Sequence, residues 1–99
     1  PELLLLDEPA ASLDLGAREE LLQLLGAYAS EPSSPAMVMV THHVEEIPPG
    51  FTHALLLRRG AISAAGPLTE VMTSENLTAA FGLALHVTRD GDRFSARAA

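Results

Sequence analysis

Two short apolar runs separated by a helical pattern constrain the fold of this chain more than any other feature. Leu3–Leu6 and Ala36–Thr41 are almost uninterrupted, which is typical of strands buried on both faces of a parallel sheet. Between them, Asp14 stands where a helix N-cap is expected, before a helical pattern over Leu15–Ala29. This order predicts an α/β fold built on a βαβ unit, with parallel strands and a right-handed crossover. The apolar face of the helix is predicted to comprise Leu21, Leu24, Leu25 and Tyr28.

Shorter elements are predicted after the βαβ unit. A helical turn over Val44–Ile47 should end at the Pro-Pro-Gly sequence that follows. Arg59-Gly60 and Asp90-Gly91 are expected to be the turns of two hairpins. The strands of these hairpins and two short helices between them are expected at His53–Arg58, Ala61–Ala65, Leu68–Met72, Glu75–Phe81, Leu83–Val87 and Arg93–Ala96.

Charge and composition exclude several classes of partner and site. The net charge of −7 comes from 13 acidic residues against six arginines, so no basic patch is expected and nucleic acid is not a predicted partner. No apolar run reaches the length of a membrane span and no signal peptide is visible, so direct membrane insertion is not expected. The absence of cysteine excludes disulfides and thiolate metal sites. We therefore expect a cytosolic, soluble region.

Ionisable side chains follow both predicted strands. Asp7 and Glu8 come directly after the first strand, and His42 and His43 after the second. The carboxyl ends of parallel strands meet at the sheet edge where open α/β sheets bind ligands, so two carboxylates and one imidazole are expected to converge there. Successive side chains of an extended segment point to opposite sides, so His42 and His43 cannot both face Glu8.

Structural roles for these residues stay open at this point. The two carboxylates could simply cap a turn at a strand end, and His42 could be a strand-end histidine with a satisfied hydrogen bond. Asp14 could act only as a helix cap. The pair Glu45-Glu46 is expected to be solvated.

Three motifs in order resemble those of ABC-type ATPases. LLLLDEP resembles the Walker B motif, ASLD the D-loop and VTHH the H-loop, while LLLRRGAISAAGPLTEVMTSENLTAAFG resembles the usual tail of the family. The chain looks most similar to the nucleotide-binding subunits of bacterial ABC transporters. The resemblance implies that residues 1–99 are the C-terminal part of an ABC-type ATP-binding domain. The fold would then be the C-terminal half of a P-loop NTPase, with a parallel βαβ core followed by small hairpins and short helices.

The resemblance also implies a role for each matching residue. Asp7 would help to hold Mg²⁺, usually through water, and hard oxygen ligands suit that ion. Glu8 would be the catalytic glutamate that orients or deprotonates the attacking water, and His42 would link the γ-phosphate of ATP to Glu8. Asp7, Glu8 and His42 would thus bind Mg²⁺ and ATP together. The D-loop, which reaches across a dimer, would comprise Ser12, Leu13 and Asp14.

The activity that the resemblance implies is Mg²⁺-dependent ATP hydrolysis that drives transport through membrane-spanning partner subunits. The protein would pair with a second ATP-binding subunit and would be cytoplasmic, peripheral on the inner face of the cell membrane. The alternative is a non-transport ABC-family ATPase, or a truncated module that is not catalytic alone. Without any lysine or adjacent glycine pair, the chain contains neither a Walker A motif nor the family's signature, and no Q-loop is visible. We therefore expect the N-terminal half of the site to lie elsewhere, and the isolated fragment to be inactive.

Overall fold

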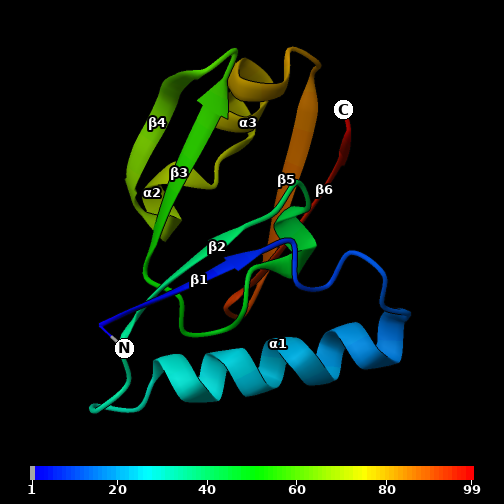
Figure 1. Cartoon of the computed structure of the whole chain (residues 1–99). Helices are drawn as coiled ribbons and strands as arrows, with labels where there is room; N and C mark the ends of the chain where they lie inside the picture. Colours follow the sequence, from blue (N-terminus) through cyan, green and yellow to red (C-terminus); the bar gives the residue numbers. More distant parts are fainter. Residues whose placement is uncertain (1) are drawn as a thin grey trace. The chain divides into compact units, whose positions relative to one another are not determined.

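The chain forms two compact units, one up to Phe51 and one over Thr52–Ala99. The structure, a computed structural model, describes residues 2–99 (Figure 1). Pro1, the first residue of the predicted 1–99 domain, lies outside the described residues. Each unit is described by itself. Within residues 2–99, no helix is both long enough and apolar enough to cross a membrane.

The first unit is the predicted βαβ unit. Strand β1 (Leu3–Asp7) pairs in parallel with β2 (Ala36–Val40), and α1 (Leu15–Ala29) connects them (Figure 1). A single 3-10 turn, η1 (Val44–Glu46), follows β2. The parallel pairing and the connecting helix are confirmed, and the second strand ends one residue earlier than predicted.

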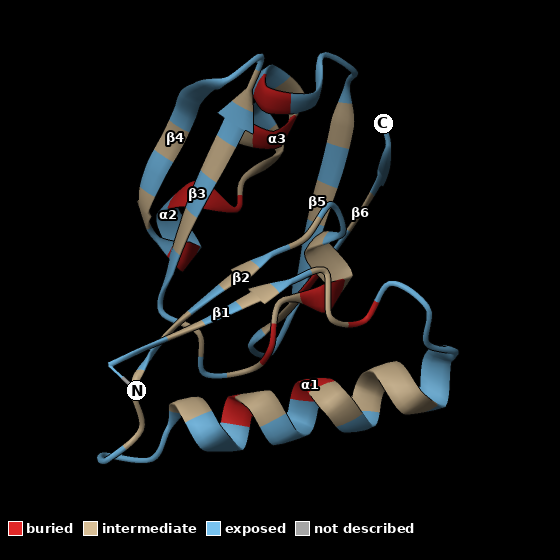
Figure 2. Cartoon of the chain, in the orientation of Figure 1, coloured by how far each residue is buried: buried red, intermediate tan, exposed pale blue. Residues whose placement is uncertain are grey.

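The two strands are not buried on both faces, contrary to the sequence prediction. Alternate residues are exposed: Leu3 by 55%, Leu5 by 64%, Val38 by 48% and Val40 by 45% (Figure 2). The sheet has two strands among the described residues, and α1 runs along one side of the pair, so only one face of each strand is half-buried. The half-buried residues are Leu4, Leu6, Met37 and Met39.

Helix α1 begins as predicted, and its packed side matches the predicted face only in part, because Leu21 and Leu25 are half-buried. The Asp14 carboxylate accepts a hydrogen bond from the Ala17 N–H at 2.9 Å, which confirms the N-cap. The buried residues are Leu22 and Gly26, whereas Leu24 of the predicted face is 68% exposed. Tyr28, also of that face, is 43% exposed. Leucines lie on several sides of this helix, so their spacing alone did not identify the side that packs.

Gly26 is buried because the segment after η1 approaches the α1 backbone there. A Cβ atom added at Gly26 would lie 2.4 Å from the Pro49 carbonyl oxygen, too close for any real contact. At Gly16, near the start of the same helix, an added Cβ atom would lie an ordinary 3.7 Å from an Asp14 carboxylate oxygen. Gly26 and Gly16 therefore allow a controlled comparison, since both lie in α1 but only Gly26 has no room for a Cβ atom.

We expect Gly26→Ala to lower the free energy of unfolding of the full-length protein by about 1–3 kcal/mol, because the Pro49 backbone must shift. Gly16→Ala should be neutral or stabilising by up to about 1 kcal/mol, since alanine has the higher helix propensity. Chemical denaturation of both variants measures the difference. Equal stability of the two variants would contradict the close packing of Gly26.

The second unit consists of two hairpins and two short helices. β3 (His53–Arg58) pairs antiparallel with β4 (Ala61–Pro67), and β5 (Leu85–Asp90) with β6 (Arg93–Ala98). Between the hairpins lie α2 (Leu68–Val71) and α3 (Ser74–Phe81). Both predicted hairpins and both helices are confirmed, although four of the strand ends differ by two or three residues. The core of this unit comprises Leu68, Val71, Met72, Leu77, Ala80 and Phe94.

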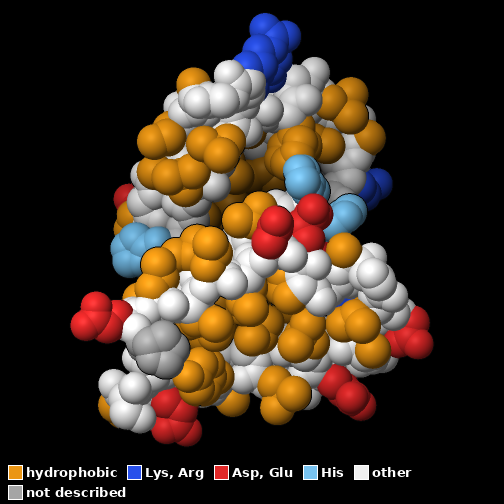
Figure 3. All heavy atoms as spheres, in the orientation of Figure 1, with side chains coloured by type: hydrophobic (Ala, Val, Ile, Leu, Met, Phe, Trp, Pro, Cys, Tyr) orange, Lys and Arg blue, Asp and Glu red, His pale blue; other side chains and the backbone are white. Residues whose placement is uncertain are grey.

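The visible surface agrees with the acidic composition of the chain. Acidic side chains outnumber arginines on the face shown in Figure 3, and hydrophobic side chains are exposed on both units. The sequence as a whole has 13 acidic residues and a net charge of −7.

Candidate functional site

The site lies where the two parallel strands of the first unit end. The register places Asp7, the last residue of β1, opposite Val40, the last residue of β2. The Glu8 N–H then donates to the Val40 carbonyl oxygen at 2.8 Å, one residue beyond the strand. Side chains that directly follow the two strands are therefore held at one edge, as the sequence predicted.

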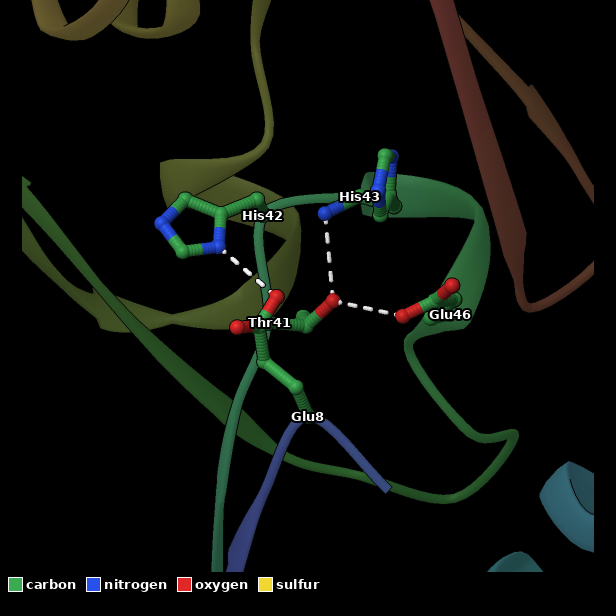
Figure 4. Close-up of polar contacts among 5 residues, drawn as sticks. All are labelled: Glu8, Thr41, His42, His43 and Glu46. Carbon is green, nitrogen blue, oxygen red and sulfur yellow. Dashed lines mark hydrogen bonds and ion pairs between the residues drawn. The ribbon is translucent and has the colours of Figure 1, made fainter. Parts of the chain in front are cut away.

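Glu8 and His42 are in direct contact at this edge. The Glu8 Oε1 atom lies 2.8 Å from the His42 Nδ1 atom, while the ring of His43 points away from Glu8 (Figure 4). The predicted convergence of the carboxylate and the first histidine is thus confirmed. The two side chains are 37% and 72% exposed, respectively, so the pair is accessible to a ligand.

Glu8 raises the pKa of its partner. The hydrogen bond that Glu8 accepts from His42, followed by the charge of that carboxylate, raises the pKa of His42 above its ordinary value, and Asp7 adds a smaller contribution. The protonated ring donates from both nitrogens. With Nδ1 directed to Glu8, the Nε2–H of the protonated ring remains as a second donor.

The backbone of Glu8 has an unusual conformation that the sequence did not predict. Its φ angle is 46°, in the left-handed region, where a non-glycine residue costs about 1–2 kcal/mol. The chain turns here, and the Ala11 N–H donates to the Glu8 carbonyl oxygen at 3.2 Å. Glycine would suit this backbone better, which supports a function for the carboxylate itself.

Asp7 fits the role of a water-mediated Mg²⁺ ligand. Its side chain is exposed and makes no hydrogen bond or ion pair with another residue in the described range. Residues 2–99 contain no group of three or more potential metal ligands. Mg²⁺ keeps several waters and often uses one or two carboxylates together with substrate phosphates, so a single carboxylate here is compatible with that role.

The predicted D-loop connects the site to α1. Ser12, Leu13 and Asp14 are all exposed, and Leu13 is 41% exposed despite being hydrophobic. The neighbouring Ala10 is buried, and its carbonyl oxygen accepts from the Leu13 N–H at 3.1 Å. The carboxylate of Asp14 caps α1, which fixes the segment before it. A dimer contact through these residues stays a prediction.

Sequence reasoning missed two residues beside His42. The Thr41 hydroxyl donates to the Glu46 Oε1 atom at 2.8 Å (Figure 4). Glu46 is only 6% exposed, so the prediction that this glutamate is solvated is wrong. The 3-10 turn brings residue 46 back over residue 41, a contact that a sequence pattern of two adjacent glutamates does not indicate.

The chain is similar to parts of known proteins. No family model matches it. It is 44% identical over 93 residues to the uncharacterized ABC transporter ATP-binding protein YlmA of Bacillus subtilis (strain 168), covering 94% of this chain and 35% of that protein. It is 46% identical over 77 residues to the molybdenum import ATP-binding protein ModC of Shewanella oneidensis, covering 78% of this chain and 21% of that protein.

A solved structure has a similar fold. An inward-facing conformation of an ABC transporter, assigned to the metal-chelate type, matches with a TM-score of 0.74 and 30% sequence identity over 97% of this chain and 38% of that chain. The predicted α/β fold class is therefore confirmed. The chain spans only about a third of the length of this structure and of the Bacillus relative.

Proposed function

We propose that this chain, a homologue of ABC transporter ATP-binding proteins over the segment that it spans, forms the γ-phosphate side of an ATP hydrolysis site. Residues 1–99 would be the C-terminal part of the ATP-binding domain of a longer protein. The observation that carries the proposal is the 2.8 Å contact between Glu8 and His42 at the ends of two parallel strands. ATP would bind against the solvent-exposed side chains of this pair.

Each side chain has a role that its chemistry supports. The Glu8 carboxylate accepts a proton from, or orients, the water that attacks the γ-phosphate. His42 is held by Glu8 and donates from its other ring nitrogen to a phosphate oxygen. This hydrogen bond stabilises the negative charge that develops on the phosphate during hydrolysis. Asp7 would hold Mg²⁺ through water, and the ion would neutralise charge on the phosphates of ATP.

Partners follow from the same proposal. The similar proteins include an ABC transporter ATP-binding protein and a molybdenum import ATP-binding protein, which supports a role in transport through membrane-spanning partner subunits. The protein would then work at the cytoplasmic face of the cell membrane. The exposed segment Ser12, Leu13 and Asp14 would contact a second ATP-binding subunit.

The proposal is tested by comparing the full-length protein with the 99-residue chain. We expect Mg²⁺-dependent phosphate release from ATP only in the full-length protein, because this chain has no lysine and so lacks the P-loop that supplies most phosphate affinity. Phosphate release with and without a chelator, and calorimetric titration of ATP into the folded chain, are the measurements.

Two results would count against the proposal. Full-length protein that releases no phosphate from ATP would refute the proposed hydrolysis site. Micromolar ATP binding by the 99-residue chain would refute the proposal that this chain supplies only one half of the ATP site. Hydrolysis that is coupled to no membrane-spanning subunit would indicate the alternative, a non-transport ABC-family ATPase.

A further inference from the structure

Three hydrogen bonds close the turn that contains His42. The Thr41 hydroxyl donates to Glu46 Oε1 at 2.8 Å and accepts from the His43 N–H at 3.1 Å. The Glu46 N–H donates to the His43 carbonyl oxygen at 3.0 Å. One hydroxyl thus serves as donor and acceptor at once, which a threonine side chain can do and a valine side chain cannot.

Glu46 anchors this turn from the interior of the unit. It is the one buried polar or charged residue in the described part of the chain, with 6% of its surface exposed. Burying a carboxyl group is costly unless it is hydrogen-bonded, and its bond to Thr41 offsets part of that cost. An apolar residue would pack inside this small unit at lower cost. The burial of Glu46 therefore suggests that its hydrogen bond to Thr41 has a function.

His42 needs such support more than its neighbours do. Its side chain is 72% exposed, and Glu8 is its hydrogen-bond partner among the described residues. Few packing contacts therefore fix the ring, and its direction depends on the backbone between residues 41 and 43. That backbone is held on both sides of His42, by the Thr41 hydroxyl and by the His43 N–H (Figure 4).

We propose that Thr41 and Glu46 are positioning residues that orient the His42 backbone so that its ring reaches Glu8. This inference rests on the proposed function of the Glu8–His42 pair and adds two residues that would orient His42. Neither residue needs to touch the nucleotide. Their effect on hydrolysis should pass entirely through His42.

The first test is Thr41→Val in the full-length protein, which keeps the side-chain shape and removes the hydroxyl. We expect kcat for ATP hydrolysis to fall roughly 10- to 100-fold, as misplaced catalytic groups typically cause, with little change in KM for ATP. Thr41→Ser, which keeps the hydroxyl, should restore most of kcat. Glu46→Leu should reproduce the loss, and Glu46→Gln, whose amide oxygen can still accept from Thr41, should restore most of the rate.

The second test separates positioning from general stability. In a His42→Ala background, Thr41→Val should cause no further loss of kcat, because the group that it positions is gone. A further loss of similar size to that in the wild type would overturn the proposal. Thermal unfolding of each variant shows whether it is folded, and loss of folding in both Thr41→Val and Glu46→Leu would assign the contacts to stability alone and overturn it.

The two proposals fail in different ways. If His42→Ala hydrolyses ATP at the wild-type rate, the proposed role of the Glu8–His42 pair is wrong. If His42→Ala is impaired while Thr41→Val and Glu46→Leu are not, the pair stands and the positioning role is refuted.

Discussion

Glu8→Gln in the full-length protein should retain ATP binding and lose hydrolysis by about 10²- to 10⁴-fold, the usual effect of removing a general base. The amide has nearly the same size as the carboxylate and keeps an acceptor oxygen for His42 Nδ1. It lacks the charge and the basicity that the attacking water requires. Because ATP then binds without being consumed, the variant should also accumulate as an ATP-bound dimer.

Steady-state phosphate release and ATP binding by calorimetry measure the two parts of this expectation, and gel filtration with ATP measures the dimer. Glu20→Gln is a matched control, since it makes the same chemical change at an exposed position of α1. Wild-type turnover in Glu8→Gln would show that Glu8 is a strand-end carboxylate without a catalytic role.

The order of elements and the meeting of the strand ends could be predicted because each depends on local sequence. Apolar runs identified β1 and β2, and parallel pairing then brought Glu8 and His42 to one edge whatever the details of packing. The turn signals of the second unit likewise located both hairpins. Three of their four strands proved longer than predicted because pairing continues along the ladder, as from Leu85 opposite Ala98 to Asp90 opposite Arg93.

Features set by tertiary contact could not be predicted in the same way. The buried face of α1 is set by the approach of Pro49 to Gly26, which leucine spacing does not encode. The apolar runs suggested strands covered on both sides, but Leu5 and Val38 are exposed in a pair of strands with one helix beside it. Burial of Glu46 depends on a turn that folds back over Thr41.

The positive φ angle of Glu8 was neither predicted from the sequence nor explained by a tertiary contact. Sequence reasoning assigned Glu8 a chemical role through a family resemblance and left its backbone out of account. The angle of 46° places a carboxylate where glycine would be favoured. Strain at a residue with an independent chemical assignment strengthens that assignment, because the side chain is then kept at a cost to stability.

His42→Ala should reduce ATP hydrolysis in the full-length protein by about 10²-fold or more, the typical effect of removing a preorganised donor to a developing anion. His43→Ala should leave hydrolysis close to the wild-type rate. The physical reason is geometric: only the ring of the first histidine reaches Glu8, at 2.8 Å, while the ring of the second points away. Alanine at position 42 removes both the contact to Glu8 and the proposed donor to phosphate.

The comparison of the two variants is sharper than either alone, because the same residue type is removed at neighbouring positions of one turn. Both histidine side chains are exposed, so neither substitution should disturb the core. His43 takes part in the turn through its backbone N–H and carbonyl groups, which alanine retains. Phosphate-release rates measured side by side therefore report on the imidazole rings alone. If His43→Ala were the impaired variant and His42→Ala the active one, the histidine that faces the nucleotide would be the second, and the Glu8–His42 contact would have no part in hydrolysis.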